Sequence, residues 1–345
     1  MKKYLSIIAG AALVLAAVSC NKLLQSENVA NLPTGEYHEV TVGAVTDEAA
    51  TRATSGTTVV TGEAAINSVQ VFALTSDGNV AVYQKASAAK VSITLRTDVA
   101  YTIYAVANCA TDLSAVKTKS AIEKTAVALT SESRTGFVMA GSASLAAGKT
   151  SLSVSVKRLV ARINLKSVTQ EANFKTVAGD MTIKNVFISN VVGNQNIAGS
   201  ATASTWYNKM GRYDGTKTNY VTTAKAEAPA MTAADAPTLP YPFYCYANSS
   251  TVTPAGWSTA TYAGQHTMLV IAATFGSGST VYYYPIDINK RIGGDINQNY
   301  TYDVTATITN YGSTDEPNKE VETGIATFTV KTAAWTGGAE VNATI

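Results

Sequence analysis

The sequence predicts an all-β protein made of antiparallel β-sandwich domains, and three observations carry this prediction. The chain has 345 residues, with 47 Thr and 18 Tyr, residue types that fit the pleated, half-buried surface of a strand. Apolar residues recur at every second position, which is the period of a strand with one buried face. Turn residues separate these runs, and only residues 120–129 look helical, so long crossover helices are not expected.

The first twenty residues have the pattern of an export signal. Lys2 and Lys3 precede an uncharged apolar stretch that is too short to span a bilayer, which favours a secretory signal. Ala17, Val18 and Ser19 then lead into Cys20, an order that is typical of bacterial lipoproteins. We therefore interpret residues 1–20 as a lipoprotein signal peptide and expect lipidation at Cys20.

Residues 21–52 are expected to form a pro-segment. They contain two basic and five acidic side chains, and within them Val40, Val42 and Ala44 alternate on one side of a short strand. A polar loop with Arg52 at its centre follows, which suits a trypsin-like protease acting between Arg52 and Ala53. Taken alone, however, this loop fits an ordinary linker arginine better.

The alternation continues through the rest of the chain and predicts a series of strands. We expect them at residues 69–74, 91–95, 101–108, 152–156, 159–165, 181–189, 243–247, 268–275, 281–288 and 300–309. A boundary between residues 170 and 180 would divide them into two sandwiches of comparable size. We place the N-terminal domain at residues 53–175 and the C-terminal domain at residues 176–345.

Charge, histidine and cysteine usage exclude several function classes. Charged residues make up 14% of the chain and the net charge is +2, which gives no electrostatic footprint for nucleic acid. With only His38 and His266, neither a zinc site nor a histidine-based catalytic triad is expected. Cys109 and Cys245 could pair, but two separate buried thiols fit better. We expect no metal, no cofactor and no enzymatic activity.

Three motifs suggest binding chemistry but fit a simpler structural role. Residues 148–150 (GKT) lack the first glycine of a phosphate-binding loop, so a hairpin turn is the better interpretation. Residues 295–299 open like a calcium loop but lack its glycine and its final glutamate, which favours a turn into a strand. The tyrosines at 241–244 and 282–284 either form a stacking platform for sugar rings or pack across strands, and we favour packing.

The C-terminal end has the pattern of a strand that could be exchanged between subunits. Ala326, Phe328 and Val330 alternate, a glycine pair interrupts the run, and Val341, Ala343 and Ile345 alternate again. The last three resemble Val40, Val42 and Ala44 in size and spacing. Either they form the last strand of their own domain, or they fill the groove that a removed strand leaves in a neighbour. Such donation is β-augmentation, and head-to-tail donation builds an open filament.

Together these segments resemble the major fimbrium subunit (fimbrillin) family of Bacteroidales type V pili. The resemblance rests on the leader, on the acidic segment that ends at Arg52, and on four short motifs at residues 101–108, 158–163, 299–304 and 330–335. It implies two transthyretin-like β-sandwich domains and export as a lipoprotein. It also implies removal of an N-terminal strand by an arginine-specific protease, followed by polymerisation through strand exchange.

The expected function is therefore that of a structural pilin in a cell-surface fimbrium, supporting adhesion or biofilm formation. Its expected partners are further copies of itself, other fimbrial anchor and tip subunits, the protease, and the outer membrane that holds the lipidated precursor. Whether the chain is a stalk, anchor or tip subunit stays open. The alternative is a monomeric lipid-anchored surface protein that binds glycan through its tyrosines and keeps residues 21–52.

Overall fold

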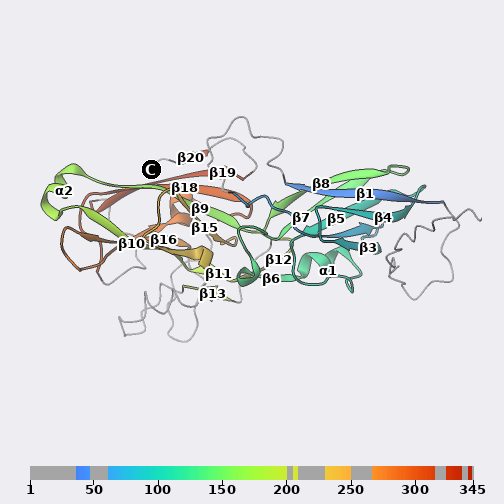
Figure 1. Ribbon diagram of the computed structural model, residues 1–345, viewed down its shortest axis with the longest axis horizontal. Helices are drawn as coiled ribbons and strands as arrows, with labels where there is room; N and C mark the ends of the chain where they lie inside the picture. Colours follow the sequence, from blue (N-terminus) through green and yellow to red (C-terminus); the bar gives the residue numbers. More distant parts are fainter. Residues whose placement is uncertain are drawn as a thin grey trace, which may run out of the picture.

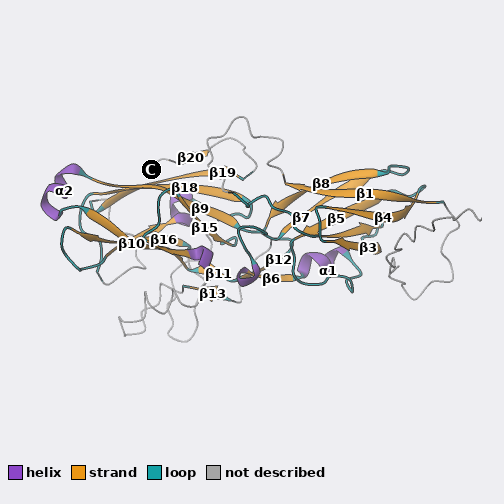
Figure 2. Ribbon diagram, in the orientation of Figure 1, coloured by secondary structure: helices purple, strands orange, loops and turns teal. Residues whose placement is uncertain are grey.

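The strands of this protein form two units that lie end to end along the long axis of the molecule (Figures 1 and 2). The computed structural model describes residues 36–46, 61–199, 205–208, 230–249, 266–314, 324–335 and 341–343. Strands dominate in both units and the helices are short, which confirms the all-β prediction. Within the described residues, no helix is both long enough and apolar enough to span a bilayer.

The first unit is a seven-stranded sheet that folds over on itself. Its strands are β1 (Tyr37–Thr46), β2 (Val69–Leu74), β3 (Val80–Ala86), β4 (Lys90–Arg96), β5 (Tyr101–Ala107), β7 (Met139–Leu145) and β8 (Ser151–Arg158). Their order is β3-β2-β5-β7-β8-β1-β4. Because β7 and β8 pair only through Met139 with Arg158 and Ala140 with Lys157, the sheet bends there into two packed layers.

The bend between β7 and β8 requires a glycine. A Cβ atom added to Gly141 would lie 1.9 Å from the carbonyl oxygen of Ser155 in β8. Only a residue without a side chain allows this approach of two backbones. The two layers therefore close around a single apolar core that β1, β2, β4, β5, β7 and β8 all supply.

The outer face of β2 and β5 is also covered. Phe72, Leu74, Tyr104 and Val106 point away from the sandwich core and pack in a second cluster. The segment that follows β5 contributes to this cluster and holds α1 (Lys119–Lys124), β6 (Ala126–Ala128) and η3 (Leu129–Ser131). The helix expected at residues 120–129 is therefore shorter than predicted. It begins where the Thr118 hydroxyl accepts a hydrogen bond from the Ala121 amide.

The second unit is a sandwich of a four-stranded and a five-stranded sheet, ordered β14-β10-β16-β17 and β15-β9-β18-β19-β20. Its elements are β9 (Ala161–Gln170), α2 (Ala172–Ala178), β10 (Met181–Ser189), β11 (Val191–Val192), β12 (Asn194–Asn196), β13 (Trp206–Tyr207), η5 (Ala230–Thr232), β14 (Ala233–Asp235), β15 (Tyr241–Cys245), β16 (Met268–Phe275), β17 (Tyr282–Asp287), α4 (Ile288–Ile292), β18 (Tyr300–Ile308), β19 (Ala326–Ala334) and β20 (Val341–Ala343).

The pairing of β9 moves the division between the units toward the N-terminus. β9 pairs with β15 and β18, although the boundary predicted at residues 175 and 176 assigns it to the first domain. The five-stranded sheet of the second unit thus begins directly after Leu159 and Val160, which are both buried, while β12 pairs back with β6. The sequence alone hides this because the alternation runs on through residues 159–165 without a turn signal.

The antiparallel prediction holds for most neighbours but not for all. In each unit the first strand in the sequence lies inside a sheet and is parallel to a later strand, β1 to β8 and β9 to β18. Cys109 and Cys245 are both buried and unpaired with each other, so the prediction of two separate thiols is confirmed.

A candidate strand-acceptor groove

Strand β1 occupies the centre of a three-stranded layer in the first unit. It pairs antiparallel with β4, from Tyr37 opposite Arg96 to Gly43 opposite Lys90. On its other side it pairs parallel with β8, from Thr41 to Thr46. Bonds outside these ladders extend the contact, since the Thr41 amide donates to the Thr150 carbonyl at 2.9 Å and the Ala44 amide to the Ala89 carbonyl at 2.8 Å. Removing β1 would therefore expose strand edges on both sides of the gap.

The side chains of β1 that face the core are the three that the alternation predicts. Val40 and Val42 are fully buried and Ala44 is almost so, and all three belong to the core of the first sandwich. Burying a valine side chain stabilises the fold by roughly 1.5–3 kcal/mol. An empty groove would expose this apolar core to water, so another strand with small apolar residues at alternate positions would be bound favourably.

The described residues before and after the predicted cleavage point both lie near the end of β8, at the junction of the two units. Thr46, at the end of β1, lies opposite Val156, two residues before Arg158. Further along the chain, the Glu63 carbonyl accepts a hydrogen bond from Arg158 Nε at 2.9 Å. Arg52 and Ala53 lie between these two points and outside the described residues, as does Cys20.

The two candidate donor stretches at the C-terminal end differ in their surroundings. β19 is paired with β18 along its whole length and with β20 on its other side. Its Ala326, Phe328 and Val330 are buried in the core of the second unit. Among the described strands, β20, which contains Val341 and Ala343, pairs with β19 alone. Ile345 lies outside the described residues.

A buried charged cluster at the junction was missed by sequence reasoning. Arg162 Nη1 lies 2.8 Å from Glu63 Oε2, and both side chains are 2% exposed. Arg158 and Arg162 both face the ring of Trp335, with Cζ atoms 4.4 and 4.9 Å from its centroid. The available signal was the pair of arginines in the otherwise apolar run of residues 158–163. Nothing in the sequence pointed to Glu63 as their partner, 99 positions away.

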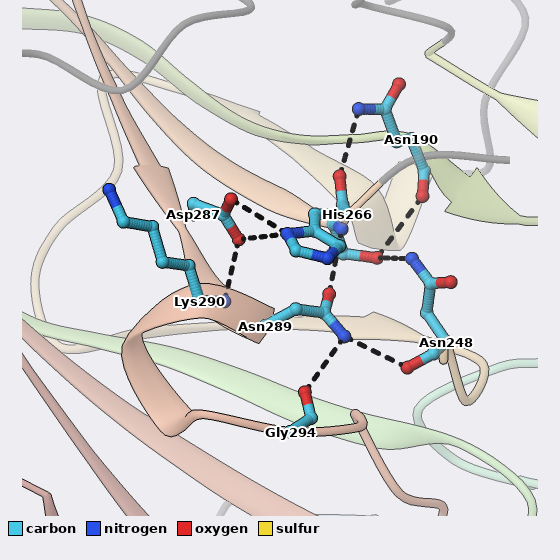
Figure 3. A network of polar contacts seen from close by, with 8 residues as sticks. Asn190, Asn248, His266, Asp287, Asn289, Lys290 and Gly294 are labelled. Atoms are coloured by element: carbon cyan, nitrogen blue, oxygen red, sulfur yellow. Dashed lines mark hydrogen bonds and ion pairs between the residues drawn. The ribbon is translucent and has the colours of Figure 1, made fainter. Parts of the chain in front are cut away.

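A second polar network joins loops at one side of the second unit (Figure 3). His266 Nδ1 lies 2.9 Å from Asp287 Oδ2, and Asp287 caps α4 by accepting from the Lys290 amide. Asn289 donates to the carbonyl oxygens of Asn248 and Gly294. These bonds satisfy buried backbone groups where strands end, so the network stabilises the loops.

The tyrosines that suggested a sugar platform contribute mainly to packing. Tyr244 and Tyr284 are fully buried, and Tyr284 donates to the Asn310 carbonyl. Tyr282 is partly buried and packs against Phe275 and Tyr311, with ring centroids 5.7 and 4.8 Å away. The preferred interpretation of these residues, cross-strand packing, is thus confirmed.

The motifs with a weak binding signal lie in turns. Gly148 has φ +76° in the turn between β7 and β8, but it is not the hairpin turn that was expected, because these strands pair only at Met139 and Ala140, far from the turn. Residues 295–299 lead directly into β18. Among the described residues, no three His, Cys, Asp or Glu side chains gather as a metal site would require.

The two sandwiches and the central first strand define a class of all-β proteins. Residues 37–155, from the start of β1 into β8, match the family model of the major fimbrial subunit protein (FimA). The sequence-based resemblance to fimbrial subunits is confirmed, and the family matched is one of structural subunits rather than enzymes. No curated protein sequence matches this chain.

Solved structures extend the similarity of fold to both units. A putative cell adhesion protein from Bacteroides eggerthii shares 22% identity over 88% of this chain and 98% of its own, with a TM-score of 0.64. A fimbrilin from Porphyromonas gingivalis shares 14% identity over 86% of this chain and 97% of its own, with a TM-score of 0.60. A putative cell adhesion protein from Parabacteroides distasonis covers 88% of this chain and all of its own, at 16% identity and a TM-score of 0.57.

Proposed function

We propose that this chain is a structural pilin subunit of a cell-surface fimbrium and that it polymerises by protease-triggered strand exchange. In this proposal an arginine-specific protease cuts between Arg52 and Ala53, and β1 leaves with the lipidated N-terminal segment. The C-terminal strand of another subunit then fills the groove. The fibre contributes to adhesion or biofilm formation, and anchor and tip subunits are further partners.

The observation that carries the proposal is the position of β1. A strand at the edge of a sheet could leave without opening the fold, but β1 lies between β4 and β8 and supplies three residues to the core. Its loss would create a groove with free backbone groups on both sides. A strand from a neighbouring subunit restores both the hydrogen bonds and the apolar contacts.

The surroundings of the two C-terminal strands favour β20 as the donor. β19 supplies buried side chains to its own sandwich, so its departure would open the second unit. Within the described part of the chain, β20 pairs on one side, through Val330, Lys331 and Thr332 of β19. Its release would leave the long pairing of β19 with β18 intact.

The decisive experiment deletes residues 341–345 from the full chain. We expect a folded, exported and cleaved protein that remains monomeric, measured by electron microscopy and sedimentation after treatment with an arginine-specific protease. The paired substitution Val341→Asp with Ile345→Asp should have the same effect, because unpaired carboxylates in an apolar groove prevent insertion.

The matched control replaces Asn342 by Asp, which adds one carboxylate to the same strand on the opposite face. This variant should still form filaments. Filaments from the truncated protein would exclude β20 as the donor. Phe328→Asp is unsuitable as a test of the earlier stretch, because Phe328 is buried in its own core and the change would unfold the second unit.

A further inference from the structure

Two buried arginines flank the junction between the units. Arg158 is the last residue of β8 and Arg162 the second residue of β9. Both are 2% exposed. Removing a guanidinium from water is unfavourable unless charged and hydrogen-bonding partners surround it. The partners of these two arginines therefore identify which parts of the chain are fixed at this point.

The first partner is the segment that contains Glu63. Its carboxylate lies 2.8 Å from Arg162 Nη1 and also accepts a hydrogen bond from the Tyr244 hydroxyl at 2.5 Å. Its carbonyl oxygen accepts from Arg158 Nε. In a chain cleaved after Arg52, these contacts would hold the new N-terminal region against the junction.

The second partner is Trp335, which follows β19. The guanidinium carbons of Arg158 and Arg162 lie 4.4 and 4.9 Å from the centre of its indole ring, within the range of a cation–π contact. The Trp335 amide donates to the Asn299 carbonyl at 2.8 Å, and the Asn299 side chain accepts from the Arg158 amide. Residues 336–345, which contain the proposed donor strand, begin immediately after this anchored residue.

We propose that Arg158 and Arg162 form a clamp that holds Trp335 and the Glu63 segment together at the junction. The clamp thereby fixes the start of residues 336–345, which we call the C-terminal arm. The role of the arm rests on the proposed function, whereas the clamp itself does not. The clamp fixes where the arm leaves its subunit and connects it to both sandwiches. A fixed start of the arm reduces the conformational freedom lost when the arm binds a neighbour.

The charges in the clamp are placed so that each arginine has a second contact besides Glu63. Arg162 Nε donates to the Thr301 hydroxyl at 3.0 Å, on β18, and the Trp335 indole covers both guanidinium groups. Tyr244 of β15 stacks on the same indole, with ring centroids 6.1 Å apart. Residues of β8, β9, β15 and β18 therefore meet Glu63 and Trp335 in one cluster, which couples the two ends of the mature chain.

The test measures hydrogen exchange by mass spectrometry in the purified full chain. Trp335→Leu keeps an apolar side chain but removes the indole face. We expect amide exchange in residues 61–66 to become at least tenfold faster, because the arginines that hold Glu63 lose their second contact. The matched control is Phe328→Leu, the same kind of change on β19, since Phe328 faces Arg291 at 5.5 Å and lies seven residues before Trp335 along extended chain. It should leave exchange in residues 61–66 within twofold of the parent.

The clamp is overturned if Trp335→Leu leaves exchange in residues 61–66 unchanged, or if both variants raise exchange equally along the chain. Trp335→Phe, which retains an aromatic face, covers the case in which Trp335→Leu does not fold. It should give an intermediate rate. Glu63→Gln provides the reciprocal measurement, since it should accelerate exchange of the Trp335 amide at least tenfold.

A polymer experiment separates the clamp from the proposed function. Fibres of Trp335→Leu should release subunits in denaturant at least tenfold faster than fibres of Phe328→Leu. Equal release rates would contradict a role of the clamp in holding the arm. If the parent protein forms no fibres after cleavage, the proposed function fails, while the exchange measurement on the unassembled chain still decides whether the clamp exists.

Discussion

Strands β1 and β9 occupy equivalent positions in the two units but are held in different ways. Each is the first strand of its sandwich and lies inside a sheet. Each is antiparallel to one neighbour and parallel to the other. β1 depends on its backbone ladders and on three small apolar side chains. β9 adds polar contacts that only its own sequence can make.

The difference lies in the polar side chains of each strand. In β9, Arg162 binds Glu63, and Asn164 donates to Asp303 at 2.8 Å. In the described part of β1, the corresponding contact is a single one, between His38 Nε2 and the Lys149 carbonyl. Backbone bonds and small apolar residues can be supplied by any strand with the same alternation, so β1 is suited to exchange and β9 is suited to remain.

The largest expected effect concerns the release of β1. Arg52→Ala should abolish filament formation completely, because the precursor keeps β1 in its groove. Electron microscopy and the mass of the protein after protease treatment measure this. Arg96→Ala is the control, since Arg96 is the next arginine in the sequence and binds Asp98 on the surface. Normal filaments from Arg52→Ala would show that cleavage occurs at another residue or is not required for assembly.

The next effect concerns β9, the strand that stays in its sheet. Arg162→Met leaves Glu63 buried without its cation, a change that costs about 3–5 kcal/mol of unfolding free energy. Denaturant unfolding should show this loss both in the precursor and in the cleaved protein, because β9 is present in both. A loss confined to the precursor would contradict the contrast between the two strands.

The buried carboxyl group of Glu132 also predicts a pH dependence. Burial raises the pKa of Glu132 from 4.5 to about 7, although its carboxylate accepts hydrogen bonds from the Val138 amide and from Tyr246, next to β15. The folded protein therefore holds a proton that the unfolded chain releases near pH 4.5. The contribution of Glu132 to stability should be complete below pH 4.5 and should fall by about 3 kcal/mol as the pH rises to 7.

Unfolding free energies measured between pH 4 and pH 8 test this dependence. Glu132→Gln should remove most of the slope, and the slope should be the same before and after β1 is removed. A slope that Glu132→Gln leaves unchanged, or a slope that disappears with β1, would contradict the assignment to Glu132.

The smallest effect concerns β1, the strand that the proposed exchange replaces. Val42→Ala should lower the unfolding free energy of the precursor by about 2 kcal/mol, because it removes two buried methyl groups from the core. After cleavage the same substitution should have no effect, since β1 is gone. A stability loss that persists in the cleaved protein would show that β1 stays bound.

The sequence predicted β1 and most of the other strands, but not all of them. The alternation of Val40, Val42 and Ala44 predicted β1 and its buried face, and ten further predicted runs coincide with strands. β7 was missed because its sequence, MAGSASL, consists of small residues with low strand propensity. β3 was missed because it is mostly half-buried, which weakens the alternation.

The remaining features depend on contacts between distant segments. Local patterns carry no information on which strands pair, so the central place of β1 and the parallel pairing of β9 with β18 could not be predicted. The same holds for Glu63 with Arg162. The pairing of β9 with strands of the second unit is also invisible in the sequence, because β8 and β9 follow one another without a turn signal.

The most direct test of the central claim is a disulfide between the proposed donor strand and the groove. Thr41 lies opposite Ser92 in the pairing of β1 with β4, and both side chains are exposed. If Val341 and Ala343 replace Val40 and Val42, Asn342 takes the place of Thr41. Thr41→Cys with Ser92→Cys should form an intrachain disulfide in the precursor, which verifies that the positions are close enough to bond. In oxidised filaments, Asn342→Cys with Ser92→Cys should give a ladder of covalent multimers on a non-reducing gel. Filaments of this variant that yield only monomers would contradict strand exchange into the groove of β1.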